Sequence, residues 1–275
     1  MNAYDIIISE TGKDGWCGGM PPGIKPAQWC RSRKSGLPMK HLFTVRVPEE
    51  YRARGKTFVA ISVFQDLTDK RIEGVEESFR RKQVNAKRLK IPFWKNLSDY
   101  LAERHAQEVF AKHNHDDGWA WIWLTEKEFA ALMCEPPPLD ALDAHLGIET
   151  RNDLFFEPRT QKLKLSLRKG DINAGKALNG FPKWERAINT LNEAEIEKII
   201  ATEYIPMFSE LGRRMKLERF WSYAHFGGTA SPATVEPPFS PAYLEFDESL
   251  GNPNLGGDGA CQIDLLNEKL AWACG

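Results

Sequence analysis

The sequence lacks the features that mark membrane and secreted proteins. No segment approaches the roughly 18 consecutive apolar residues of a membrane-spanning helix, and the chain does not open with a basic stretch followed by a long apolar run. Its five cysteines form an odd set without a CxxC pair, which favours reduced thiols over a disulfide framework. A Cys17–Cys30 bridge is the alternative. We therefore expect a cytoplasmic globular protein.

The sequence also lacks the motifs of familiar enzymes. No Ser or Cys stands in a nucleophile-elbow pattern. The stretch Gly256-Gly257-Asp258-Gly259 is followed by neither the Lys-Ser/Thr pair of a phosphate-binding loop nor a helix pattern, and it is typical of a turn. We therefore predict that the chain is not an enzyme and needs no cofactor.

Two segments of the chain resemble one another. Residues 115–124 and 256–265 each place an Asp-Gly turn before a strand pattern with Ile and Leu at the same offsets. Each also follows a Gly-Gly pair, Gly18-Gly19 in the first half and Gly227-Gly228 in the second. The pattern predicts an α+β fold of two related β-rich halves, 1–150 and 151–275, that arose by internal duplication and pack as one compact unit. The sheet is expected to be mainly antiparallel, with helical insertions.

Strand and helix patterns alternate along the chain. β-branched and aromatic residues predict a hairpin from 41–47 and 56–64. Charged segments with helical spacing predict helices over 69–90 and 97–112, and a capping box predicts another that starts at Thr125. Strict alternation over 162–168 predicts a half-buried strand with Lys162, Lys164 and Arg168 facing water. The pattern over 193–220 predicts either one long helix or two helices broken at Pro206. In the first repeat strand, Trp119, Trp121 and Trp123 share one face and are expected to pack in the core.

The net charge of −1 hides segregated blocks. Residues 1–104 carry a net charge of +8 and residues 151–219 carry +4, whereas 105–150 carry −7 and 220–275 carry −6. Both acidic blocks contain a repeat strand, so their turn ends could form one acidic surface that attracts a basic partner. Two separate solvated loops are the alternative. The carboxylates of this predicted partner-binding surface are Asp116, Asp117, Glu245, Asp247, Glu248 and Asp258.

Two other kinds of site compete with that surface. His113, His115 and Asp117 lie close enough in sequence to ligate a divalent metal, although a polar turn is the more common structure for such a segment. Cys17, Cys30 and His41 lack the close spacing of zinc ligands. The basic helix at 70–90 could contact nucleic acid phosphates, but an overall pI near 6.6 argues against that role.

Several short segments resemble the YwqG-like family of bacterial proteins. They are Gly18-Gly19-Met-Pro21, Leu37-Pro-Met39, Leu42-Phe-Thr-Val45, Phe226-Gly-Gly228, Ala242-Tyr-Leu-Glu-Phe-Asp247, Gly257-Asp258-Gly259 and Leu270-Ala-Trp-Ala-Cys-Gly275. The likeness covers both ends of the chain. It departs from the family pattern at Thr229-Ala-Ser231 and in the charged helices expected over 69–112. It implies no catalytic residues. Similar proteins include cytoplasmic immunity proteins against toxins of contact-dependent and type VI secretion systems.

The resemblance therefore predicts an immunity protein that binds and neutralises a cognate toxin. Nuclease toxins tend to be basic, so an acidic surface on the inhibitor would steer association. The expected partner is a basic nuclease, not a membrane or a nucleic acid, and a homodimer stays open. A metal-binding enzyme that uses His113, His115 and Asp117 and a nucleic-acid-binding module are the alternative functions.

Overall fold

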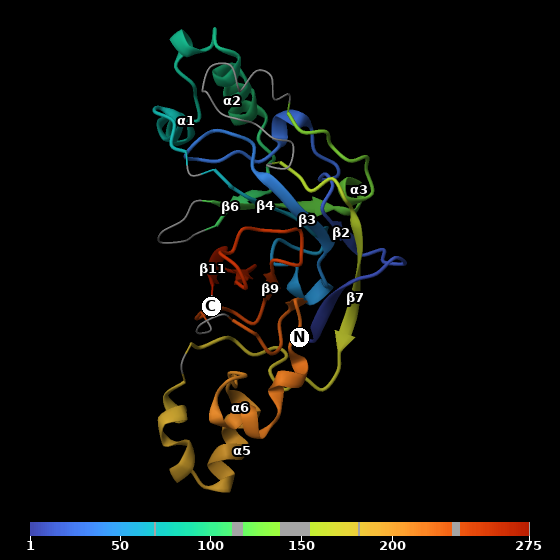
Figure 1. Cartoon of the computed structure of the whole chain (residues 1–275), viewed down its shortest axis with the longest axis vertical. Coiled ribbons are helices and arrows are strands. Elements are labelled where there is room, and N and C mark those ends of the chain that lie inside the picture. The colour runs from blue at the N-terminus through green and yellow to red at the C-terminus, as the bar shows by residue number, and fades with distance from the viewer. Residues whose placement is uncertain (69, 112–117, 138–154, 181, 233–236, 275) are drawn as a thin grey trace. The chain divides into compact units, whose positions relative to one another are not determined.

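The structure is a computed structural model, and it describes residues 1–68, 70–111, 118–137, 155–180, 182–232 and 237–274. Figure 1 draws the other residues in grey. The chain forms two compact units, each built from segments that are distant in sequence. Unit 1 contains Met1–Asp14, Val47–Gly55 and Lys162–Gly275; unit 2 contains Gly15–Arg46 and Lys56–Gln161. We also predict from the sequence that the halves 1–150 and 151–275 pack as one compact unit, and this stays a prediction.

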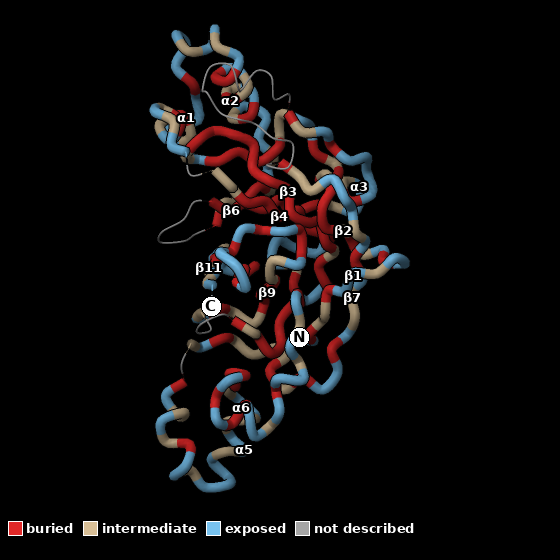
Figure 2. The backbone as a smooth tube through the Cα atoms, viewed as in Figure 1, coloured by how far each residue is buried: buried red, intermediate tan, exposed pale blue. Residues whose placement is uncertain are grey.

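Unit 2 contains an antiparallel sheet in the order β2-β3-β4-β6-β5. Its strands are β2 (Gly15–Cys17), β3 (Lys40–Arg46), β4 (Phe58–Gln65), β5 (Glu108–Phe110) and β6 (Trp119–Thr125). The predicted antiparallel pairing of 41–47 with 56–64 is confirmed. The three tryptophans of β6 are buried, as predicted, and Figure 2 shows burial following β3, β4 and β6. Truncating one of these indoles to Ala would cost about 3–5 kcal/mol.

Short helices accompany this sheet. They are η1 (Pro26–Gln28), α1 (Val75–Arg81), η3 (Ala86–Arg88), α2 (Pro92–Glu103) and α3 (Glu126–Phe129). The predicted helix over 69–90 is wrong in length, because Gly74 and Lys82 adopt left-handed backbone angles that end α1 on both sides. The one expected over 97–112 starts earlier, with Pro92 in its first turn, and gives way to β5. The capping box at Thr125 is confirmed.

The strands of unit 1 are also antiparallel and follow the order β11-β10-β9-β8-β1-β7. Its strands are β1 (Ala3–Ile8), β7 (Gln161–Arg168), β8 (Ala224–Phe226), β9 (Tyr243–Asp247), β10 (Ala260–Asp264) and β11 (Lys269–Ala273). Because the pairing in both units is antiparallel and helices are present, the predicted α+β class with a mainly antiparallel sheet is confirmed.

One charged side chain of β7 lies inside unit 1. Lys162 and Lys164 face water as predicted, but Arg168 is buried. Its guanidinium pairs with Asp5 at 2.6 Å and Asp171 at 3.3 Å. The expectation that Arg168 is exposed is therefore wrong, because Asp5 on the neighbouring strand β1 and Asp171, three residues further along the chain, compensate its charge.

The helices of unit 1 are short and have their own apolar cluster. They are η2 (Glu49–Tyr51), η5 (Lys183–Thr190), α5 (Glu193–Thr202), α6 (Glu210–Arg214) and η6 (Leu217–Phe220). Of the two alternatives for 193–220, the interrupted helix is the one observed, because α5 ends at Thr202 and α6 begins at Glu210. Ile205, Met207, Leu211 and Leu217 are buried together between these helices, although Figure 2 shows much of α5 exposed. Among the described residues of both units, no helix is both long and apolar enough to span a membrane.

Candidate functional site

Glu245, one of the predicted partner-binding carboxylates, lies in the interior of unit 1. It is only 2% exposed, and β-sheet register places it between His225 on β8 and Gln262 on β10. Its Oε1 accepts hydrogen bonds from His225 Nε2 (3.1 Å) and Ser231 N (2.7 Å), and Oε2 accepts one from Gln262 Nε2 (2.9 Å). The structure thus places Glu245 in a buried polar row and not on the surface.

The charge of Glu245 affects a neighbouring thiol. Cys261 precedes Gln262 on β10 and is fully buried. Burial, followed by the negative charge of Glu245, raises the pKa of the Cys261 thiol well above its ordinary value. The Cys261 thiol therefore stays protonated and is a poor nucleophile.

Three other predicted carboxylates converge at one end of the sheet. Asp247 ends β9 and is the register partner of Ala260, at the start of β10, so Asp258 approaches β10 beside it. Asp247 Oδ1 accepts hydrogen bonds from Ser249 N (2.8 Å) and Oγ (2.6 Å). Two of the predicted contacts, Asp116 and Asp117, lie outside the described residues.

The turn before β10 fixes the orientation of this group. Glu248 Oε1 accepts hydrogen bonds from the backbone N–H groups of Leu255 (2.9 Å) and Gly257 (3.0 Å). Gly256, Gly257 and Asp258 have φ values of 79°, 85° and 52°, as the Asp-Gly turn prediction requires. Backbone donors therefore hold Glu248 over the turn that presents Asp258.

Asp247, Glu248 and Asp258 line a hollow of about 590 Å³ in unit 1. Its lining also contains three aromatic side chains, since Phe208, Trp221 and Tyr223 are 56%, 50% and 56% exposed. The Tyr223 carbonyl oxygen accepts a hydrogen bond from the Asp247 backbone N–H at 2.9 Å, which joins the aromatic and acidic sides. Such a combination of exposed aromatic rings and charge is typical of a contact surface.

Sequence reasoning missed these aromatic residues. Trp221 follows η6 and Tyr223 precedes β8, and their rings pack edge to face at 4.5 Å. Phe208 lies in the break between α5 and α6. The available signal was the alternation Trp221-Ser-Tyr223 immediately before the acidic C-terminal block, which places both rings on one side of an extended segment.

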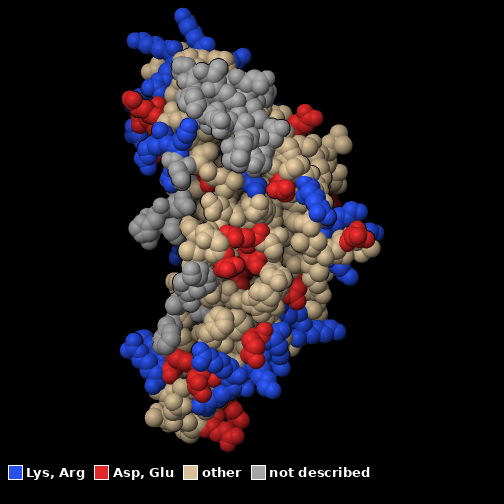
Figure 3. All heavy atoms as spheres, in the orientation of Figure 1, with Lys and Arg blue, Asp and Glu red and all other residues tan. Residues whose placement is uncertain are grey.

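The hollow lies in a strongly acidic part of the chain. Residues 220–275 contain one basic side chain, Lys269, against seven carboxylates. Figure 3 shows acidic side chains grouped near the level of β9, with mostly uncharged surface around them. No Lys or Arg is among the described residues that line the hollow. Its electrostatic field therefore favours a cationic group.

The candidate metal ligands do not form a site within the described residues. Cys17, Cys30 and His41 are buried, and no group of three or more potential ligands is found among the described residues. His41 uses both ring nitrogens, with Nδ1 3.0 Å from the Gly19 carbonyl oxygen and Nε2 2.9 Å from Thr44 Oγ1. The described cysteines are all free thiols, as expected. His113, His115 and Asp117 lie outside the described residues.

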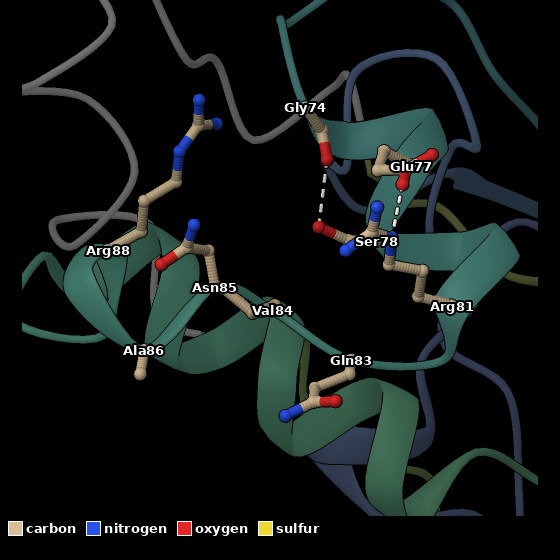
Figure 4. A pocket seen from close by; sticks show the side chains of 9 residues that line it. All are labelled: Gly74, Glu77, Ser78, Arg81, Gln83, Val84, Asn85, Ala86 and Arg88. Carbon is tan, nitrogen blue, oxygen red and sulfur yellow. Dashed lines mark hydrogen bonds and ion pairs between the residues drawn. The ribbon is translucent and has the colours of Figure 1, made fainter.

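A second hollow, of about 420 Å³, lies between α1 and η3 in unit 2 (Figure 4). It contains part of the basic segment that could contact phosphates. Arg80 and Arg81 both pair with Glu77, and the hydrogen bond from Arg80 is the main cause of a lowered Glu77 pKa. Arg88 donates to the Glu73 carbonyl oxygen at 2.6 Å and covers the Trp94 ring. These arginines already have partners in the folded unit, which weakens the case for a phosphate site.

No protein-family model, curated protein or solved structure matches this chain. The YwqG-like resemblance therefore stays a prediction. The hollow formed by Asp247, Glu248, Asp258, Phe208, Trp221 and Tyr223 is the strongest candidate site, and below it is called the acidic-aromatic hollow.

Proposed function

We propose that this chain is a cytoplasmic immunity protein of the YwqG-like type, which binds a cognate basic toxin and neutralises it by protein contact without catalysis. The acidic-aromatic hollow is the proposed contact surface. One observation carries this proposal: three carboxylates chosen from charge segregation alone line the same hollow as three half-exposed aromatic rings. Aromatic anchors surrounded by complementary charge are typical of protein interfaces.

The chemistry of the hollow favours a nuclease as the partner. A nuclease that binds nucleic acid presents cationic side chains in its substrate cleft, and an inhibitor with an acidic surface can occupy that cleft. Carboxylates that face solvent raise the association rate, whereas aromatic residues slow dissociation. Both kinds of side chain line this one hollow.

The internal duplication belongs to the same proposal. In each unit a buried histidine lies beside a Gly-Gly pair with positive φ: His41 Nδ1 is 3.0 Å from the Gly19 oxygen, and His225 Nδ1 is 2.8 Å from the Gly227 oxygen. This shared arrangement supports a common origin. The repeat strands differ in position, because β3 and β4 separate β2 from β6, whereas β9 alone separates β8 from β10. A duplication would thus require an added strand in unit 2.

Co-purification followed by a protection assay tests this function. Tagged chain is recovered from its native cells at moderate salt, and the dominant co-purifying protein is identified and expressed with it in a toxin-sensitive host. We expect growth to be rescued by the wild-type chain and not by the double variant Asp247→Asn/Asp258→Asn. Glu193→Gln/Glu197→Gln removes two exposed charges from α5 and is the matched control. A partner that is harmless to cells, or rescue by every variant, would overturn the proposal.

A further inference from the structure

We infer that the acidic-aromatic hollow receives an arginine side chain of the partner, with its guanidinium between the exposed rings and the carboxylates. This inference deepens the proposed function and rests on it. The volume of about 590 Å³ falls within the range of about 300–1,000 Å³ for pockets that bind discrete groups. A long side chain with its flanking backbone is therefore a suitable occupant.

The aromatic side of the hollow favours a delocalised cation. Trp221 and Tyr223 pack edge to face at an interplanar angle of 70°, and each keeps about half of its surface exposed. Ring faces attract cations, and a planar guanidinium can stack on them with less loss of hydration than an ammonium group. The rings therefore favour arginine over lysine.

The acidic side offers oxygen atoms that are oriented but unused. Asp247 and Glu248 each hold one oxygen in backbone or hydroxyl hydrogen bonds. Within the described part of the chain, no donor reaches Asp247 Oδ2, Glu248 Oε2 or the Asp258 carboxylate. Asp258 is also exposed on a turn with a left-handed backbone. Guanidinium presents paired N–H donors that match such carboxylates.

The three carboxylates of the hollow carry charge of the same sign. A cationic donor would form charge-assisted hydrogen bonds with them, which are stronger than neutral ones. No Lys or Arg among the described lining residues supplies the compensating charge. The partner is thus expected to supply it, and a second copy of this chain is the competing source.

An NMR titration tests this inference. The probe is N-acetyl-arginine-N-methylamide, and the reporter is the indole N–H resonance of Trp221, assigned among the nine tryptophans by its loss in Trp221→Phe. We expect a saturable shift with the arginine probe and binding of the lysine analogue that is about fivefold weaker. In Asp247→Asn/Asp258→Asn, which keeps the hydrogen-bond acceptors, arginine binding should weaken at least tenfold.

The control and the contrary outcomes follow from the same titration. Glu193→Gln/Glu197→Gln should bind the arginine probe like the wild type, because α5 contributes no residue to the hollow. The inference is overturned if no saturable shift occurs, if the double amide variant responds like the wild type, or if sedimentation shows a dimer that covers Trp221. Protection that depends on Asp247 and Asp258 without arginine binding would refute this inference alone. Arginine binding without any toxin partner would refute the proposed function.

Discussion

Replacement of Glu245 tests whether this carboxylate is structural, unlike those that line the acidic-aromatic hollow. Both nitrogens of the His225 ring face acceptors, since Nδ1 lies 2.8 Å from the Gly227 oxygen and Nε2 lies 3.1 Å from Glu245 Oε1. The same carboxylate also accepts hydrogen bonds from the Ser231 N–H and the Gln262 amide. Glu245 is thus the acceptor for three buried donors.

The expected cost depends on the replacement. Glu245→Ala leaves three buried donors without their acceptor, and each such donor costs about 1–3 kcal/mol, so we expect a loss of about 3–5 kcal/mol in the free energy of unfolding. Glu245→Gln preserves the shape but offers one acceptor oxygen and an NH₂ group to three donors. At least one buried donor then lacks a partner, at a cost of about 1–3 kcal/mol.

Urea unfolding followed by circular dichroism measures these effects. Asp258→Asn removes the same charge from an exposed turn and should stay within about 0.5 kcal/mol of the wild type. The amide variant should fall between this control and Glu245→Ala. The reasoning is refuted if Glu245→Ala is as stable as Asp258→Asn, because Glu245 would then be dispensable in the interior.

Three further predictions concern pH, packing and thiol chemistry. Burial, opposed by hydrogen bonds with the backbone, lowers the pKa of His41 to about 4. Because the unfolded residue titrates near ~6.5, the folded chain should lose about 3 kcal/mol of its free energy of unfolding as the pH falls from ~6.5 to ~4. Urea titrations of His41→Gln should not show this loss. Gly228→Ala places a Cβ 2.5 Å from Asp171 Oδ2, whereas a Cβ at Gly257, which has a similar φ, meets no atom within 4 Å. Gly228→Ala should therefore lower the free energy of unfolding by ~1–3 kcal/mol more than Gly257→Ala. Equal stabilities of the two variants would disprove the clash. Cys274 is the one exposed thiol among five, so a chromogenic thiol reagent should label one cysteine in the folded chain and all five in denaturant; rapid labelling of more would contradict the buried positions.

Local patterns predicted much of the fold. Alternation identified β7, and the Thr125 capping box identified the start of α3, because both signals depend on residues close in sequence. Arg168 was misplaced, since its burial depends on Asp5, more than 160 positions away. Its charge gave no sign of that partner.

The candidate site was only partly predictable for a related reason. Glu245 looks like a surface residue in sequence, and only the register of β8, β9 and β10 brings it between His225 and Gln262. Asp247 and Asp258 were found because they belong to the acidic C-terminal block of the sequence. The contribution of Trp221 depends on how η6 ends before β8, and no spacing rule in the sequence specifies that arrangement.

The central claim is that the acidic-aromatic hollow binds a basic protein partner. Its most direct test is the dissociation constant of the purified toxin complex, measured at two salt concentrations for the wild type and for Asp247→Asn/Asp258→Asn. We predict that the double variant binds at least tenfold more weakly at low salt and that the difference shrinks at high salt, because screening weakens charge pairing at the rim. Equal dissociation constants at both salt concentrations would contradict the claim.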